Sequence, residues 1–210
     1  MNQILQAIFD GVLDGDSAAV QEKTREALEA GTKPQAILKE GLIAAMTEVG
    51  RRFEIGDYYV PEMLIAGRAM KEALKILKPR LVADKIEPIG KVVLGTVKGD
   101  LHDIGKNLVA MMMEGAGFQV IDLGTDVDEN KFIEAVKEHQ PKIVGFSALL
   151  TTTMPMMKTT IEAFSAAGVR DKVKVMIGGA PVTQNYADEI GADAFAPDAA
   201  TAATRARELI

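Results

Sequence analysis

The spacing of apolar residues changes once along this chain, near Gly90, and this change limits the folds that the chain can adopt. Over residues 2–80 the apolar side chains recur at helical spacing. After Gly90, short β-branched runs alternate with helical segments, which is typical of strand-helix units around a parallel sheet. The sequence therefore predicts a helical domain over residues 1–84 and an α/β domain over residues 90–210, joined by a charged linker.

Four helices are expected in the first domain. Gly15 and Gly31 are plausible ends of two short helices, and Pro34 opens a longer helix that runs to Gly56. Pro61 opens the fourth helix, because proline is well tolerated in a first turn. The expected inward face of this helix consists of Met63, Leu64, Gly67, Met70, Leu74 and Leu77. Short connections imply antiparallel packing, so we expect a four-helix bundle.

Five strands are expected in the second domain, with helices in the gaps between them. The candidate strands cover residues 91–97, 119–122, 142–147, 174–177 and 194–196. This alternation favours a flavodoxin-like (Rossmann-type), doubly wound parallel sheet. Ligands of such folds bind at the carboxyl ends of the strands, which is where the polar loops of this sequence fall.

The composition excludes several classes of function. The chain has no cysteine, which removes disulfides, thiolate metal ligands, iron-sulfur clusters and a cysteine nucleophile. With 24 basic and 30 acidic residues, its net charge of -6 disfavours nucleic acid as a partner. No apolar run approaches the ~20 residues of a membrane span, and the N-terminus lacks the layout of a signal peptide. We therefore expect a cytoplasmic protein with no membrane partner.

The loop after the first strand, residues 97–107, places His102 between Asp100 and Asp103. A phosphate-binding loop would be richer in glycine, whereas neutral imidazole is a common metal ligand. A carboxylate on the second ring nitrogen would orient that ligand, and either aspartate could supply it. The alternative is that His102 is a solvated loop residue. His139, near the end of an expected helix, is interpreted as a surface residue.

Two further loops lie at expected carboxyl ends. Residues 147–155 contain a cluster of hydroxyls, of which Thr153 could either cap the next helix or face a ligand beside the apolar Leu149. Gly178 and Gly179 end the fourth strand and permit close approach of a ligand or of a neighbouring helix. No single one of these loops decides the function.

Taken together, the three loops resemble the motif pattern of the cobalamin-binding family. The matching residues are Asp100-x-His102-x-x-Gly105, Ser147-x-Leu149 and Gly178-Gly179, at the spacing of that family. The helical half is similar to the cap module of cobalamin-dependent methionine synthase and of small corrinoid proteins in methyl-transfer systems. The resemblance covers nearly the whole chain, and three motifs at matching spacing are highly specific.

The resemblance implies a role for each motif residue. His102 would be the lower ligand of cobalt, and Asp100 would accept a hydrogen bond from its far nitrogen. Thr153 matches the position of a serine in methionine synthases, a departure that keeps the hydroxyl. The cofactor tail would lie between the serine loop and the Gly-Gly strand. The implied cofactor-binding residues are Gly99, Asp100, Leu101, His102, Asp103, Gly105, Ser147, Leu149, Thr151, Gly178 and Gly179.

The implied function is that of a methyl carrier in one-carbon metabolism. The cofactor would be a cobalamin or related corrinoid that cycles between methylcob(III)alamin and cob(I)alamin. No independent catalytic centre is recognisable, so the chain would act as the corrinoid subunit of a methyltransferase system. Its expected partners are a substrate-specific methyltransferase and an acceptor methyltransferase that uses tetrahydrofolate, coenzyme M or a thiol; a reductive activase is a further candidate. Tyr59, Val60 and Met63 are candidate cap contacts above the corrin.

Three other readings remain open. One is the small module of an adenosylcobalamin mutase, which the helical half disfavours. Another is a cobalamin-responsive regulatory protein, for which the chain has no basic helix. The last is a flavin- or nucleotide-binding flavodoxin-like protein, which the histidine in the first loop disfavours.

Overall fold

The computed structural model describes residues 2–210, which divide into two compact units. One unit contains the chain up to Pro88 together with residues 115–117, and the other contains the remainder. Among the described residues, no helix is both long enough and apolar enough to cross a membrane.

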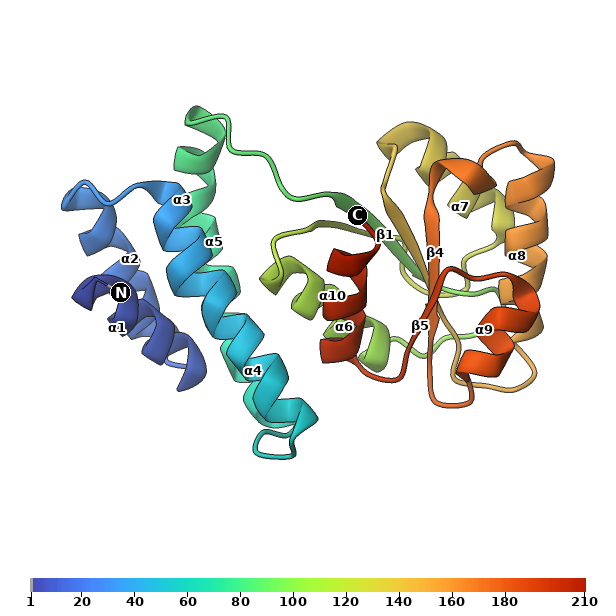
Figure 1. The fold of residues 1–210 in the computed structure, drawn as a ribbon, viewed down its shortest axis with the longest axis horizontal. Coiled ribbons are helices and arrows are strands. Elements are labelled where there is room, and N and C mark those ends of the chain that lie inside the picture. Colours follow the sequence, from blue (N-terminus) through green and yellow to red (C-terminus); the bar gives the residue numbers. More distant parts are fainter. Residues whose placement is uncertain (1) are drawn as a thin grey trace. The chain divides into compact units, whose positions relative to one another are not determined.

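The first unit is a bundle of four helical segments, as the sequence predicts (Figure 1). The first two segments are α1 (Gln3–Leu13) and α2 (Ser17–Glu29), and the last is α5 (Val60–Ala83). The third segment is continuous and consists of α3 (Pro34–Ala36), a π-helical stretch (Ile37–Ile43) and α4 (Ala44–Glu54). Asn2 and Asp16 cap α1 and α2 by accepting backbone N–H groups, which explains where these helices start. Of the apolar face expected for α5, Met63, Gly67, Met70 and Leu77 are buried.

Leu64 does not follow that expectation, because its side chain is 49% exposed. Met63, expected among the cap contacts, is buried. Tyr59 and Val60, at the start of α5, are exposed.

The second unit is a five-stranded parallel sheet in the order β2-β1-β3-β4-β5, which confirms the doubly wound fold. Its strands are β1 (Lys91–Thr96), β2 (Gln119–Asp122), β3 (Ile143–Ser147), β4 (Lys174–Gly178) and β5 (Ala194–Ala196). The helices are α6 (Ile104–Gly115), α7 (Glu129–His139), α8 (Pro155–Ala166), α9 (Gln184–Ile190) and α10 (Ala199–Glu208), with a short 3-10 turn at Arg170–Lys172. Helices α6 and α10 cover one face of the sheet, and α7, α8 and α9 cover the other (Figure 1).

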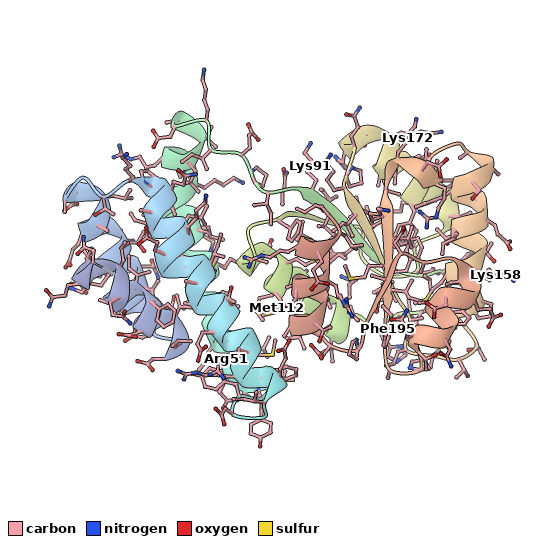
Figure 2. All side chains as sticks on the ribbon, viewed as in Figure 1. Arg51, Lys91, Met112, Lys158, Lys172 and Phe195 are labelled. Atoms are coloured by element: carbon pink, nitrogen blue, oxygen red, sulfur yellow. The ribbon has the colours of Figure 1, made fainter. Side chains whose placement is uncertain are left out.

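The core of this unit explains why the strands pair in register. Val93, Val144 and Val175 lie on adjacent strands and are buried. Strands buried on both faces read as continuous apolar runs, as these do. Lys158 on α8 is exposed and points away from the sheet (Figure 2). The buried strands form a rigid base for the loops at their carboxyl ends.

Candidate functional site

The three motif loops lie side by side at the carboxyl edge of the sheet. The His102 loop follows β1, and the hydroxyl loop follows β3. Gly178 is the last residue of β4, and Gly179 comes directly after it. Strands β1, β3 and β4 are consecutive neighbours in the sheet, so loops far apart in sequence meet at one edge.

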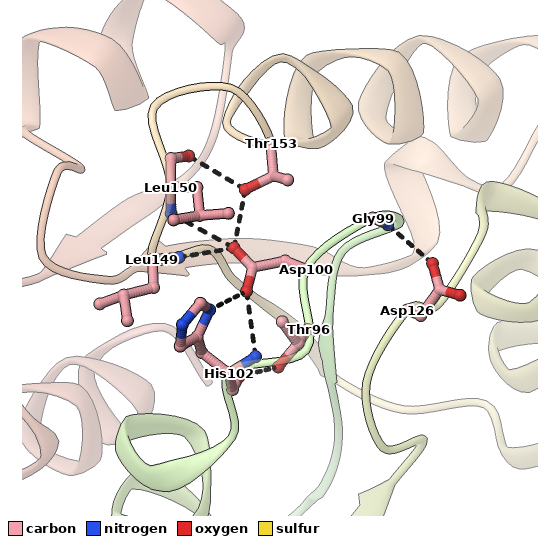
Figure 3. A network of polar contacts seen from close by, with 8 residues as sticks. All are labelled: Thr96, Gly99, Asp100, His102, Asp126, Leu149, Leu150 and Thr153. Atoms are coloured by element: carbon pink, nitrogen blue, oxygen red, sulfur yellow. Dashed lines mark hydrogen bonds and ion pairs between the residues drawn. The ribbon is translucent and has the colours of Figure 1, made fainter.

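Asp100 links the His102 loop to the hydroxyl loop. Its side chain is fully buried, and Oδ1 lies 2.8 Å from Nδ1 of His102. Oδ2 accepts hydrogen bonds from the Thr153 hydroxyl at 2.7 Å and from the backbone N–H groups of Leu149 and Leu150 at 2.8 and 3.3 Å. Thr153 and the imidazole of His102 lie on opposite sides of the carboxylate (Figure 3).

These contacts determine the charge of Asp100. Burial alone would raise the pKa of this carboxyl, but hydrogen bonds from Thr153, His102 and Leu149 outweigh it and hold the pKa well below its usual range. Asp100 is therefore ionised near neutral pH. An ionised carboxylate only accepts hydrogen bonds, so the proton of neutral His102 resides on Nδ1 and the lone pair on Nε2.

The His102 ring is presented to a ligand rather than enclosed. Its side chain is 49% exposed, and within residues 2–210 Nε2 has no hydrogen-bond partner. The Thr96 hydroxyl donates to the His102 carbonyl at 2.9 Å and so fixes the backbone under the ring. No group of three or more potential ligands that could hold a metal is found in the described part of the chain. His102 can thus supply one ligand to a metal whose other ligands come from a cofactor.

Gly105 leaves open space beside this ligand. A Cβ added to Gly105 would meet no atom within 4 Å, so packing within the protein does not require glycine there. The Gly-Gly pair is different: a Cβ on Gly179 would lie 1.9 Å from the carbonyl oxygen of Ala148, and one on Gly178 would lie 2.9 Å from that of Ala196. Those two glycines permit close approach of neighbouring backbone. Gly105 is the position where a cofactor would use the missing side chain.

The surroundings of His102 combine apolar and hydrogen-bonding groups. Leu101 and Ile104 are 72% and 76% exposed, and Leu149 is 43% exposed. In the described chain the side-chain hydroxyls of Ser147 and Thr151 have no hydrogen-bond partner. Exposed apolar side chains beside free hydroxyls suit a ligand with a large apolar ring system and a polar tail. The donor set therefore fits a corrinoid bound through Nε2 of His102.

Other residues expected at the site lie apart from this network. Asp103 accepts a hydrogen bond from the Asn107 side chain at 3.0 Å, so Asp100 is the aspartate that contacts the imidazole. The N–H of Gly99 donates to Asp126, which lies outside the three sequence motifs. Its signal in the sequence, an aspartate in the turn after a predicted strand, is too common to be recognised alone.

Comparison with known proteins places the chain in a family. The B12 binding domain family matches residues 90–206, and a second B12 binding domain family matches residues 4–78. Trimethylamine corrinoid protein 1 of Methanosarcina acetivorans is 42% identical over 210 residues, covering 99% of this chain and 97% of that protein. Dimethylamine corrinoid protein of Methanosarcina barkeri is 44% identical over 214 residues, covering 99% and 98%.

A solved structure gives the same result for the fold. The methanol:cobalamin methyltransferase complex of Methanosarcina barkeri contains a chain that superposes with a TM-score of 0.89 at 28% identity, covering 99% of this chain and 80% of that chain. The chain belongs to the B12-binding family of corrinoid proteins, and its cofactor is a cobalamin or a related corrinoid.

Proposed function

We propose that this protein carries a methyl group on a corrinoid between two methyltransferases, with His102 as the lower ligand of cobalt. When bound, the corrinoid supplies a cobalt atom that accepts and releases the methyl group. The observation that carries the proposal is the arrangement of Thr153, Asp100 and His102, which leaves one ring nitrogen exposed.

Each residue of this arrangement would have a distinct task. Asp100 would keep the imidazole in one tautomer and make it a stronger metal ligand, because the hydrogen bond to Nδ1 places electron density on the ring. Thr153 and the Leu149 amide hold the carboxylate so that it cannot rotate away. Ser147 and Thr151 would donate to the cofactor tail, while Leu101 and Ile104 would contact its apolar ring.

The helical unit would shield the reactive face of the corrin from water. Tyr59 and Val60 are exposed at the start of α5 and are the side chains that we propose as cap contacts. Helix α5 ends at Ala83 and β1 begins at Lys91, which leaves a connection that could allow the cap to move aside for a partner. Residues 1–84 and 90–210 would thus act as a cap domain and a corrinoid domain.

The relatives indicate which partners to test. Two of them are named for trimethylamine and dimethylamine, so we propose a methylamine-specific methyltransferase as the loading partner. The methanol:cobalamin methyltransferase complex supports assembly with such a partner. A second methyltransferase would pass the methyl group to tetrahydrofolate, coenzyme M or another thiol, in the cytoplasm.

The proposal is tested by anaerobic reconstitution with a corrinoid, followed by visible spectroscopy of the wild type and His102→Ala. The wild type is expected to show an imidazole-ligated cobalt spectrum that the variant lacks. Lys98→Ala is a control in the same loop, because Lys98 is exposed and its side chain has no hydrogen-bond or ion-pair partner in the described part of the chain. Identical axial-ligand spectra for the wild type and His102→Ala would refute the assignment of His102.

A further inference from the structure

The segment that carries His102 is exposed in its middle and held at both ends. Residues 101–105 are all exposed, whereas Asp100 and Lys106, on either side, are buried. The bond to Asp100 fixes the rotation of the imidazole, but it does not fix where the backbone places the ring. That position depends on the contacts that hold the two ends of the segment.

Asp126 holds the first end. Its Oδ1 accepts a hydrogen bond from the N–H of Gly99 at 2.7 Å (Figure 3). The N–H of Asp126 itself donates to the carbonyl of Asp100 at 3.0 Å. Asp126 has a φ of 53°, a left-handed conformation that aspartate adopts more readily than most residues. Through these two bonds a single residue fixes the turn that presents Asp100 to His102.

Asp122 holds the second end. Lys106, whose side chain is 3% exposed, places Nζ 2.7 and 2.6 Å from the two carboxylate oxygens of Asp122 and 2.8 Å from Oδ1 of Asn107. A lysine is rarely buried to this degree without a partner, because desolvation of the ammonium group is costly. The first turn of α6, directly after the ligand segment, is thereby tied to the last residue of β2.

We propose that Asp122 and Asp126 are positioning residues for the axial ligand, which rests on the role of His102 proposed above. Both lie on one stretch, residues 122–126, that begins with the last residue of β2, the strand paired with β1. This stretch holds the His102 segment on both sides and leaves its centre free to face the cofactor. None of the three cobalamin-binding motifs includes it, so its contribution to ligation is separate from theirs.

The side chain of Asp126 can be separated from its backbone conformation by substitution. Asp126→Gly keeps the left-handed conformation accessible and removes the carboxylate, while Asp126→Asn keeps both an acceptor oxygen and tolerance of this conformation. Gln140→Gly is the matched control, because Gln140 also has a positive φ, 49°, and caps α7 away from the ligand segment. A general effect of relieving a left-handed residue would appear in both glycine variants.

The first measurement uses the corrinoid-free protein. Amide hydrogen exchange followed by NMR is expected to show at least tenfold faster exchange of the Gly99 N–H in Asp126→Gly than in the wild type. Asp126→Asn should restore most of the protection, and Gln140→Gly should leave it unchanged. Unaltered exchange of Gly99 in Asp126→Gly would overturn the first anchor without any reference to the cofactor.

The second measurement uses the reconstituted full chain. Asp126→Gly and Asp122→Asn are expected to lower the fraction of imidazole-ligated cobalt in the visible spectrum at least twofold, with recovery in Asp126→Asn. If Asp122→Asn does not fold, the double variant Asp122→Asn/Lys106→Met is used in its place, because it removes both charges of the pair. The Asp126 and Asp122 variants could show the same spectrum as the wild type while His102→Ala has lost the imidazole signature. That result would overturn this inference and leave the proposed function standing. An unchanged His102→Ala spectrum would instead overturn the proposed function.

Discussion

Oδ1 of Asp100 lies 2.8 Å from Nδ1 of His102, and Oδ2 of the same carboxylate is held by Thr153 from the neighbouring loop. The carboxylate thus joins two loops that leave two adjacent strands of the sheet. Through this carboxylate, the properties of the His102 imidazole depend on Thr153, which is 53 positions from Asp100 in the sequence.

Replacement of Asp100 by Asn should weaken axial ligation more than corrinoid binding. The amide has nearly the same size but no charge, so it no longer strengthens His102 as a metal ligand. Loss of such a partner commonly reduces metal affinity 10–100-fold, and we expect about a tenfold shift in the equilibrium between ligated and unligated imidazole. Visible spectroscopy of the reconstituted protein measures this shift. Asp171→Asn, an exposed aspartate in the turn before β4, serves as the control for loss of one charge.

Thr153 offers an independent check of the same arrangement. Thr153→Val removes the hydroxyl that donates to Asp100, whereas Thr153→Ser keeps it. The valine variant should move the spectrum in the same direction as Asp100→Asn, and the serine variant should resemble the wild type. A wild-type spectrum for the valine variant together with a displaced spectrum for the serine variant would show that packing of the Thr153 methyl group, and not its hydroxyl, matters.

Gly105→Ala should separate stability from cofactor binding. The added methyl group meets nothing in the protein, and alanine is better than glycine within a helix by up to about 1 kcal/mol. We therefore expect the free energy of unfolding of the corrinoid-free protein to stay constant or to rise slightly. Corrinoid affinity, measured by titration, should fall, because the methyl group occupies space proposed for the cofactor. Unchanged affinity would mean that the cofactor does not lie against Gly105.

Thr24 presents a test of stability in the helical unit. Its hydroxyl is buried and, among the described residues, has no hydrogen-bond partner. An unpaired buried polar group costs roughly 1–3 kcal/mol, so Thr24→Val should raise the free energy of unfolding by about 1 kcal/mol. Thr160→Val is the matched control, since the equally buried Thr160 hydroxyl donates to Met156 at 2.7 Å. Urea unfolding should show that this second variant is not stabilised.

The lowered pKa of Asp193 should make the stability of the protein depend on pH. Burial would raise its pKa, but the N–H of Val175 and the cations of Arg170 and Lys174 outweigh it, so the pKa is lower in the folded protein. A lowered pKa stabilises the fold above the unfolded value, about 3.9, and this contribution disappears as the pH falls through the folded value. Asp193→Asn should therefore cost about 1.5–3 kcal/mol at pH 7.

The difference between the wild type and Asp193→Asn should shrink below about pH 4, because the wild-type carboxylate then becomes protonated. Urea unfolding at a series of pH values measures this difference in the free energy of unfolding. A difference that is constant from pH 7 to pH 3 would contradict the assignment of the stabilisation to the charge of Asp193.

The sequence was sufficient for much of the fold. The expected strands differ from those of the structure by at most one residue at either end, because β-branched runs bounded by glycine and polar residues leave little freedom. The buried face of α5 is only partly predictable from the sequence. Leu64 is apolar and lies at a helical spacing, yet it is 49% exposed, because periodicity indicates which side of a helix is buried but not how wide the buried face is.

The motif residues and their spacing were also readable from the sequence, since they lie in loops directly after predicted strands. The sequence does not show whether Asp100 or Asp103 contacts His102, because both aspartates are close enough to His102 in the chain. The structure decides for Asp100, whose carboxylate is turned inward by Thr153 and the Leu149 amide. The roles of Asp122 and Asp126 depend on β2 pairing with β1, and no local pattern encodes that pairing. Local spacing fixes helices, strands and motif positions, whereas contacts between distant loops exist only once the sheet has ordered its strands.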